Sequence, residues 1–117
     1  MKRLLAIDQD VPTLNIINFS APDLGLEVFS AVHELSLWEV EVLAPDIVLI
    51  DCHLNCIDES DLCAQLKLNI QTQSIRVVLL SNAHDYGLAA KNTHADACLL
   101  KPLDGKSLIR TLRQFVN

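Results

Sequence analysis

The chain has 117 residues, of which 50% are hydrophobic and 21% are charged. This is enough for one domain with a single core, and it excludes a disordered chain. The formal net charge of −6 argues against non-specific binding of nucleic acid, and no apolar run approaches the length of a membrane span. We therefore expect one cytoplasmic domain over residues 1–117 that binds neither a membrane nor, directly, nucleic acid.

The charge is divided unevenly along the chain. Residues 1–66 carry two basic and twelve acidic residues, a net charge of −10, whereas residues 67–117 carry seven basic and three acidic residues, a net charge of +4. The sequence thus predicts an acidic end of the domain and a basic C-terminal segment.

Strand-like runs alternate with helical patterns, and the alternation repeats five times. Short β-rich runs predict strands, and segments with apolar side chains three or four residues apart predict helices. In chain order, the expected elements are a strand over 4–7, a helix over 10–20, a strand over 26–30, a helix over 33–43, a strand over 47–50, a helix over 58–70, a strand over 75–80, a helix over 84–92, a strand over 97–100 and a helix after 104.

Aspartates mark several of the expected helix starts. Asp10, Asp58 and Asp104 are each placed to act as an N-cap, and Pro12 stands in a first turn, where proline is tolerated. The segment 33–43 is ambiguous, because its apolar residues have helical spacing while part of it also alternates like a strand.

Three of the expected strands are continuous aliphatic runs, at residues 4–7, 47–50 and 77–80. Such runs are typical of strands that are buried on both faces, so the sequence predicts an α/β fold with a parallel sheet between two layers of helices. In folds of this class the functional site lies at the carboxyl ends of the strands.

Four of the five expected strands are directly followed by a polar residue, and these residues are Asp8, Asp51, Ser81 and Lys101. Two carboxylates suit Mg²⁺, and one carboxylate can act as a nucleophile that forms an acyl phosphate. A hydroxyl and an ammonium group stabilise the charge of phosphoryl oxygens. The combination predicts a site that handles a phosphoryl group.

Four segments resemble the receiver domain of two-component response regulators, including the single-domain chemotaxis type, and the resemblance covers essentially the whole chain. They are residues 4–10, 45–51, 77–81 and 95–102, with the sequences LLAIDQD, PDIVLID, VVLLS and ADACLLKP. The resemblance implies a flavodoxin-like, doubly wound (βα)5 fold with a five-stranded parallel sheet in the order 2-1-3-4-5. It also implies a cis peptide bond before the proline that follows Lys101.

The resemblance also implies residue roles in a bacterial phosphorelay. Asp51 would accept a phosphoryl group from a sensor histidine kinase or a phosphotransfer protein, and partner interactions would switch in response. Asp8, Asp51 and the backbone carbonyl of His53 would bind Mg²⁺, Ser81 would be the switch hydroxyl, and Lys101 would bind the phosphoryl group. The domain would be no enzyme beyond its own phosphorylation and dephosphorylation.

Three departures from the family pattern affect this site. Gln9 stands where the family usually has a second acid, so Mg²⁺ should bind more weakly, through the neutral Gln9 oxygen or a water. Asn82 replaces a small residue and would crowd the acyl phosphate. Cys98 replaces the aromatic residue that usually responds to activation.

The last helix carries a basic face. Lys106, Arg110 and Arg113 lie away from its apolar stripe, and Lys91 and Asp96 would belong to the same surface. Two interpretations remain open, a solvated face near a helix C-terminus and a partner surface. The resemblance implies for the second a homodimer through the last two helices and the last strand.

Two other functions compete with that of a phospho-receiver. A pseudo-receiver would act as a protein-interaction module without phosphate. The three departures favour it, and the retained Asp51, Ser81 and Lys101 oppose it. A phosphatase of the haloacid-dehalogenase type would use Asp8 as nucleophile and Asp10 as acid/base. Pro12 and the short chain argue against that enzyme.

The four cysteines are expected to be reduced, because three of them lie in or beside apolar segments. The spacing of Cys52, His53 and Cys56, with Cys63 further on, also allows a metal or redox site. Ordinary packing is the interpretation that we favour for these residues.

Overall fold

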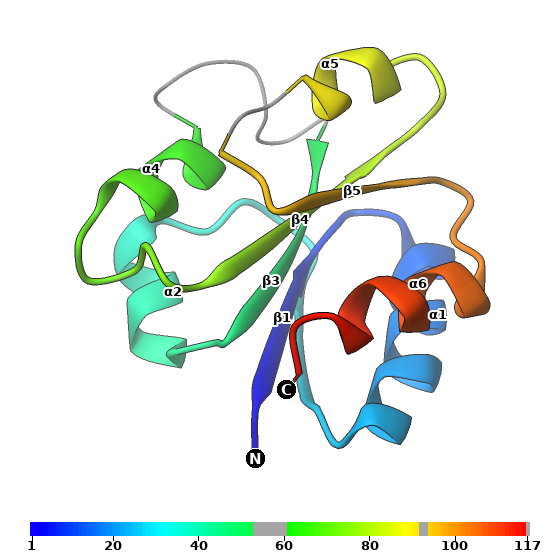
Figure 1. Ribbon diagram of the computed structural model, residues 1–117, viewed down its shortest axis with the longest axis horizontal. Helices are drawn as coiled ribbons and strands as arrows, with labels where there is room; N and C mark the ends of the chain where they lie inside the picture. The colour runs from blue at the N-terminus through cyan, green and yellow to red at the C-terminus, as the bar shows by residue number, and fades with distance from the viewer. Residues whose placement is uncertain (53–60, 92–93, 117) are drawn as a thin grey trace.

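The computed structural model describes residues 1–52, 61–91 and 94–116. Five parallel strands form one sheet in the order β2-β1-β3-β4-β5 (Figure 1), which confirms the expected fold class and strand order. The strands are β1 (Arg3–Ile7), β2 (Glu27–Ala31), β3 (Ile47–Asp51), β4 (Arg76–Ser81) and β5 (Ala97–Leu100).

Helices cover both faces of the sheet and make the fold three-layered (Figure 1). The described α-helices are α1 (Val11–Ser20), α2 (Leu37–Leu43), α4 (Leu62–Leu68), α5 (Tyr86–Ala90) and α6 (Gly105–Arg113), and a 3-10 helix, η1 (Ala21–Leu24), follows α1. Helices α1 and α6 pack on one face, and α2, α4 and α5 pack on the other. No described helix combines the length and the apolar character needed to cross a membrane.

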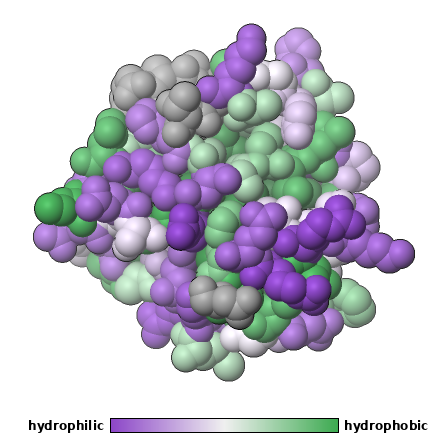
Figure 2. Space-filling view, viewed as in Figure 1, coloured by the Kyte–Doolittle hydropathy of each residue, from purple (hydrophilic) through white to green (hydrophobic). Residues whose placement is uncertain are grey.

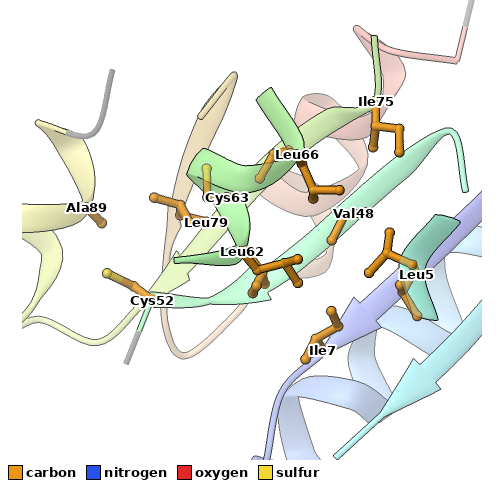
Figure 3. Packing of buried hydrophobic residues seen from close by; sticks show 13 residues of the cluster. Leu5, Ile7, Val48, Cys52, Leu62, Cys63, Leu66, Ile75, Leu79 and Ala89 are labelled. Atoms are coloured by element: carbon orange, nitrogen blue, oxygen red, sulfur yellow. The ribbon is translucent and has the colours of Figure 1, made fainter. Parts of the chain in front are cut away.

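The core is aliphatic and lies on both sides of β3, whose five residues are all buried. In Figure 3, Val48 of β3 lies between Leu5 of β1 and the side chains of Leu62 and Leu66 from α4. Burial of each such side chain contributes about 1.5–3 kcal/mol. The continuous aliphatic runs of the sequence therefore become strands that are covered on both faces.

Two helix starts differ from the sequence-based expectation, and local capping explains both. Helix α2 begins at Leu37 rather than near residue 33, because Ser36 and Glu39 form a capping box. Helix α4 is capped by Asp61, whose side chain accepts a hydrogen bond from the backbone N–H of Ala64. The expected cap, Asp58, lies outside the described residues.

The boundaries of the strands agree closely with the expectation, whereas α5 is shorter than expected. Strand β5 matches the expected residues, and β2 and β4 each begin and end one residue later than predicted. Helix α5 is shorter than the expected 84–92, and only Ala89 of its five residues is buried, so little apolar contact supports a longer helix. The peptide bond between Lys101 and Pro102 is cis, as the resemblance implies.

Candidate functional site

The four residues that the sequence places at strand ends meet at the carboxyl edge of the sheet. Asp8 follows β1, Asp51 ends β3, Ser81 ends β4 and Lys101 follows β5. Because these strands are neighbours in the sheet, their ends lie side by side. Three of the four residues line an open pocket of about 370 Å³, whose walls are Asp8, Gln9, Asp10, Asp51, Asn82 and Lys101.

Lys101 links two of the three carboxylates that line this pocket, those of Asp8 and Asp51. Its Nζ lies 2.6 Å from Oδ2 of Asp8 and 3.5 Å from Oδ1 of Asp51. The backbone N–H of Lys101 donates to the carbonyl of Ser81 over 2.7 Å, which anchors the chain just after β5 against the end of β4. The ammonium group is therefore held at the charged end of the pocket.

Asp8 is completely buried, and its two oxygens have different surroundings. Oδ1 accepts a hydrogen bond from the backbone N–H of Asp10 over 2.8 Å, whereas Oδ2 faces Lys101 and makes no hydrogen bond among the described residues beyond that ion pair. Desolvation by burial raises the pKa of Asp8, and Asp51 raises it further, while Lys101 and the N–H of Asp10 act in the opposite direction.

The Asp10 side chain caps helix α1, although it also lines the pocket. Its Oδ2 accepts hydrogen bonds from both the backbone N–H and the hydroxyl of Thr13, so Asp10 is the N-cap of α1, as expected. The Thr13 hydroxyl is the main cause that lowers the pKa of the Asp10 carboxyl. Gln9 is exposed and lines the pocket.

Ser81 and Asn82 form a small hydrogen-bonded turn beside the pocket. The Ser81 hydroxyl is buried and donates to the backbone carbonyl of Asn82 over 2.9 Å. The side-chain oxygen of Asn82 accepts from the backbone N–H of Asp85 over 2.8 Å. In this arrangement Ser81 is turned toward its neighbour, and Asn82 stands in the pocket wall, where the sequence predicted crowding.

The pocket carries oxygen donors of the kind that Mg²⁺ prefers. Mg²⁺ in proteins commonly keeps several waters and takes one or two carboxylates, and Asp8 and Asp51 supply two. The buried Oδ2 of Asp8 fits such a ligand, since among the described residues it pairs with the Lys101 ammonium group and makes no other hydrogen bond. The expected ligand at His53 lies outside the described residues, and the described part of the chain holds no group of three or more His, Cys, Asp or Glu side chains arranged for a metal.

The described cysteines are of two kinds. Cys63 and Cys98 are free thiols, and burial raises the pKa of both, that of Cys63 to about 12, so neither is an activated nucleophile. Cys52 is in a disulfide, which corrects the expectation that all four cysteines are reduced. Composition does not reveal which sulfur atoms the fold brings within bonding distance. His53 and Cys56 lie outside the described residues.

The residues of the expected partner surface fall into two environments. Lys106, Arg110 and Arg113 are exposed on α6, and Lys91 is exposed after α5. Asp96 instead accepts from the backbone N–H of Val77 over 2.8 Å and pairs with Lys67 and Arg76, as described below.

The ion pairs of Asp96 were missed by sequence reasoning. Its Oδ2 lies 2.6 Å from Nζ of Lys67, and its Oδ1 lies 3.4 Å from NH1 of Arg76. Lys67 also donates to the carbonyl of Ile75 over 2.6 Å. Nothing in the sequence pairs Lys67 with a residue so far along the chain, so only the fold reveals this contact.

A curated transcriptional regulator resembles this chain in sequence. No protein-family model matches the chain. The chain is 26% identical over 120 residues to the DNA-binding dual master transcriptional regulator RpaA of Synechocystis, with 100% of the chain and 50% of the relative covered. The chain thus spans about half the length of this curated relative.

Solved structures cover nearly the whole chain. A response regulator from Chloroflexus aurantiacus has a TM-score of 0.81 at 21% identity, covering 98% of this chain and 97% of that one. The signal receiver domain of a DNA-binding response regulator from Colwellia psychrerythraea has a TM-score of 0.80 at 20% identity, covering 99% and 98%. A chemotaxis response regulator of Vibrio cholerae has a TM-score of 0.73 at 18% identity, covering 98% of each chain. The chain therefore has the fold of the receiver domains of response regulators.

Proposed function

We propose that this domain is a cytoplasmic phospho-receiver of a two-component system, and that Asp51 accepts the phosphoryl group. The observation that carries the proposal is the placement of Asp8, Asp51 and Lys101 around one open pocket at the carboxyl edge of the sheet. The fold shared with response regulators and the distant likeness to a transcriptional regulator support it.

The chemistry assigns a distinct task to each side chain. A carboxylate oxygen of Asp51 attacks the phosphorus of the donor, the bond from phosphorus to the donor breaks, and the donor leaves with the electron pair. The acyl phosphate carries more negative charge than the carboxylate it replaces. Lys101 is close enough to turn from Asp8 toward the phosphoryl oxygens, and the Ser81 hydroxyl reaches them by rotating away from the Asn82 carbonyl.

Mg²⁺, held by Asp8 and Asp51, would neutralise the charge that gathers on the phosphoryl oxygens. Gln9 gives the pocket one carboxylate fewer than the family pattern, and the single positive charge of Lys101 already offsets part of the negative charge of Asp8 and Asp51. Both features support a weakened metal site. The Asp8 oxygen that would hold the metal now faces Nζ of Lys101, so this ammonium group would have to turn away from it.

The partner that supplies the phosphoryl group would be a sensor histidine kinase or a phosphotransfer protein. Output would be a changed preference for partners, with the turn after Ser81 and the α5–β5–α6 surface as the responding region. Cys98 is half-buried on β5 and lacks an aromatic ring. The response to phosphorylation would therefore not involve the aromatic side chain that the family usually has at this position.

The test is incubation with acetyl phosphate, with and without Mg²⁺, followed by measurement of the intact mass. We expect one added phosphoryl group that requires both Mg²⁺ and Asp51, and none in the Asp51→Asn variant. Asp23→Asn, an exposed charge removal on η1, is the matched control and should behave as the wild type. A generic phosphate ester should not be turned over.

The pseudo-receiver is the second candidate, and the amide of Gln9 in the pocket wall favours it. Absence of any adduct at high Mg²⁺ and short reaction times, in a protein that remains folded, would reject the phospho-receiver and support this candidate. An adduct that persists in Asp51→Asn would reject Asp51 as the acceptor.

A further inference from the structure

Helix α2 presents apolar side chains to solvent. Its two exposed apolar residues, Trp38 and Val42, are 70% and 62% exposed, while Val40 on the other side of the helix is completely buried. Residues four apart lie on one side of a helix, so the two exposed side chains form one strip. Ile70, two residues after the end of α4, is 79% exposed.

The strip on α2 is acidic at its borders. Glu34, Glu39 and Glu41 stand in or just before this helix, and the segment 34–43 contains no basic residue. Glu41 also stands on the rim of a hollow of about 470 Å³ that it shares with Ala44 and with the chain that leads into β4. This surface, defined by Trp38, Glu39, Glu41 and Val42, is called the α2 surface below.

Helix α6 has the opposite character. Lys106, Arg110 and Arg113 are exposed, and the helix contains no acidic residue. Figure 2 shows strongly hydrophilic side chains gathered over α6, on the right of the view, and hydrophobic ones reaching the surface at the left margin, beside α2 and α4. The uneven charge of the sequence thus becomes two separate surfaces.

These two surfaces lie on opposite layers of the molecule, because α2 packs on one face of the sheet and α6 packs on the other. We propose that the α2 surface docks the basic face of α6 from a second copy of this chain. Long arginine side chains such as Arg110 would cover the apolar strip with their methylene groups and place their charge against Glu39 and Glu41.

The distribution of charge favours the contact between α2 and α6 over a symmetric dimer through α6. A symmetric dimer through α6 would bring Lys106, Arg110 and Arg113 of the two copies together, and like charges repel. Asp96, which the sequence analysis assigned to that surface, already pairs with Lys67 and Arg76, and Asp104 caps α6 by accepting a hydrogen bond from the backbone N–H of Lys106. A contact between α2 and α6 pairs unlike charges instead. Because it joins two different surfaces on opposite faces of the molecule, it is heterologous and builds rings or open chains of more than two copies rather than two-fold dimers.

Sedimentation of the 117-residue protein over a series of concentrations in low salt tests the proposal. We expect an average mass that rises with concentration beyond that of a dimer, and an association that is about tenfold weaker in 0.5 M salt, where charges are screened. Trp38 is the only tryptophan, so its emission should shift to shorter wavelength as the protein associates. A single mass of one chain throughout would overturn the proposal.

Charge reversal identifies the two surfaces. Glu41→Lys and Arg110→Glu should each weaken self-association about tenfold, since each replaces an attraction by a repulsion. A mixture of the two variants should associate again, because each altered surface then meets a complementary one. Both side chains are exposed, and circular dichroism will verify that the variants fold. Association that ignores both substitutions, or that closes at a dimer, would assign the contact to another surface and reject the proposal. The outcome is independent of whether Asp51 accepts a phosphoryl group.

Discussion

At the scale of single residues, Asp8 has a charge that burial disfavours. Its carboxylate is completely buried, and desolvation raises its pKa even though Lys101 and a backbone N–H stabilise the ionised form. The ionised side chain therefore lowers the free energy of unfolding at neutral pH. A charge kept in such a place is typical of a functional site, where stability and activity conflict.

We expect Asp8→Asn to raise the free energy of unfolding at pH 7 by about 1 kcal/mol and to weaken Mg²⁺ binding. The pKa of Asp8 is higher in the fold than its ordinary value of 3.8. The penalty is therefore absent below that ordinary value and grows as pH rises through the raised pKa. Urea unfolding from pH 3 to pH 8 measures it, with Asp23→Asn as control. An Asp8→Asn variant that is less stable than the wild type at pH 7 would contradict this account.

At the scale of elements, α2 shows how capping decides an ambiguous segment. Residues 38–42 alternate like a strand, yet they form a helix of seven residues. The Ser36 hydroxyl accepts from the N–H of Glu39 over 3.2 Å, and the Glu39 carboxylate accepts from the N–H of Ser36 over 2.9 Å. These two bonds satisfy backbone donors that a short helix leaves open.

Ser36→Ala should lower the free energy of unfolding by about 1 kcal/mol, because it removes one half of the capping box. Ser36→Asp, which keeps an acceptor at the N-cap, should restore most of this loss. Thermal unfolding followed by circular dichroism compares the three proteins. Equal stability of the alanine variant and the wild type would show that tertiary packing alone holds α2.

At the scale of the whole molecule, Lys67 and Asp96 tie α4 to the start of β5. Burial raises the pKa of Asp96, but hydrogen bonds from Lys67 and from the N–H of Val77, together with the charges of Lys67 and Arg76, lower it more, so the net shift is downward. The ionised Asp96 therefore stabilises the fold, and this contribution is present above the ordinary pKa and lost as pH falls through the lowered one.

Asp96→Asn should lower the free energy of unfolding by about 1 kcal/mol at pH 7, a modest value because water screens a partly exposed pair. The difference from the wild type should shrink as pH falls below the ordinary pKa of 3.8. A double-mutant cycle with Lys67→Met isolates the pair. A difference that is equally large at low pH would assign the effect to packing instead of charge.

Much of the site was predictable because it depends on the ends of strands. The aliphatic runs ending before Asp8 and at Ile50 identify buried parallel strands, and the parallel arrangement places the residues after them at one edge. The sequence did not indicate that Ser81 donates to the Asn82 carbonyl, because that depends on a side-chain rotamer. The roles of Asp51, Ser81 and Lys101 in phosphoryl chemistry stay predictions.

The sequence by itself determined the order of strands and helices along the chain, the layers and the edge of the sheet that carries the polar residues, because hydrophobic periodicity and capping are local properties of the chain. Only the tertiary structure decided that Lys101 lies between two carboxylates, that Asp96 belongs to an ion-pair network, and that the acidic α2 and the basic α6 lie on opposite faces. Each of these depends on distances between residues far apart in the chain, which packing sets and local patterns do not encode.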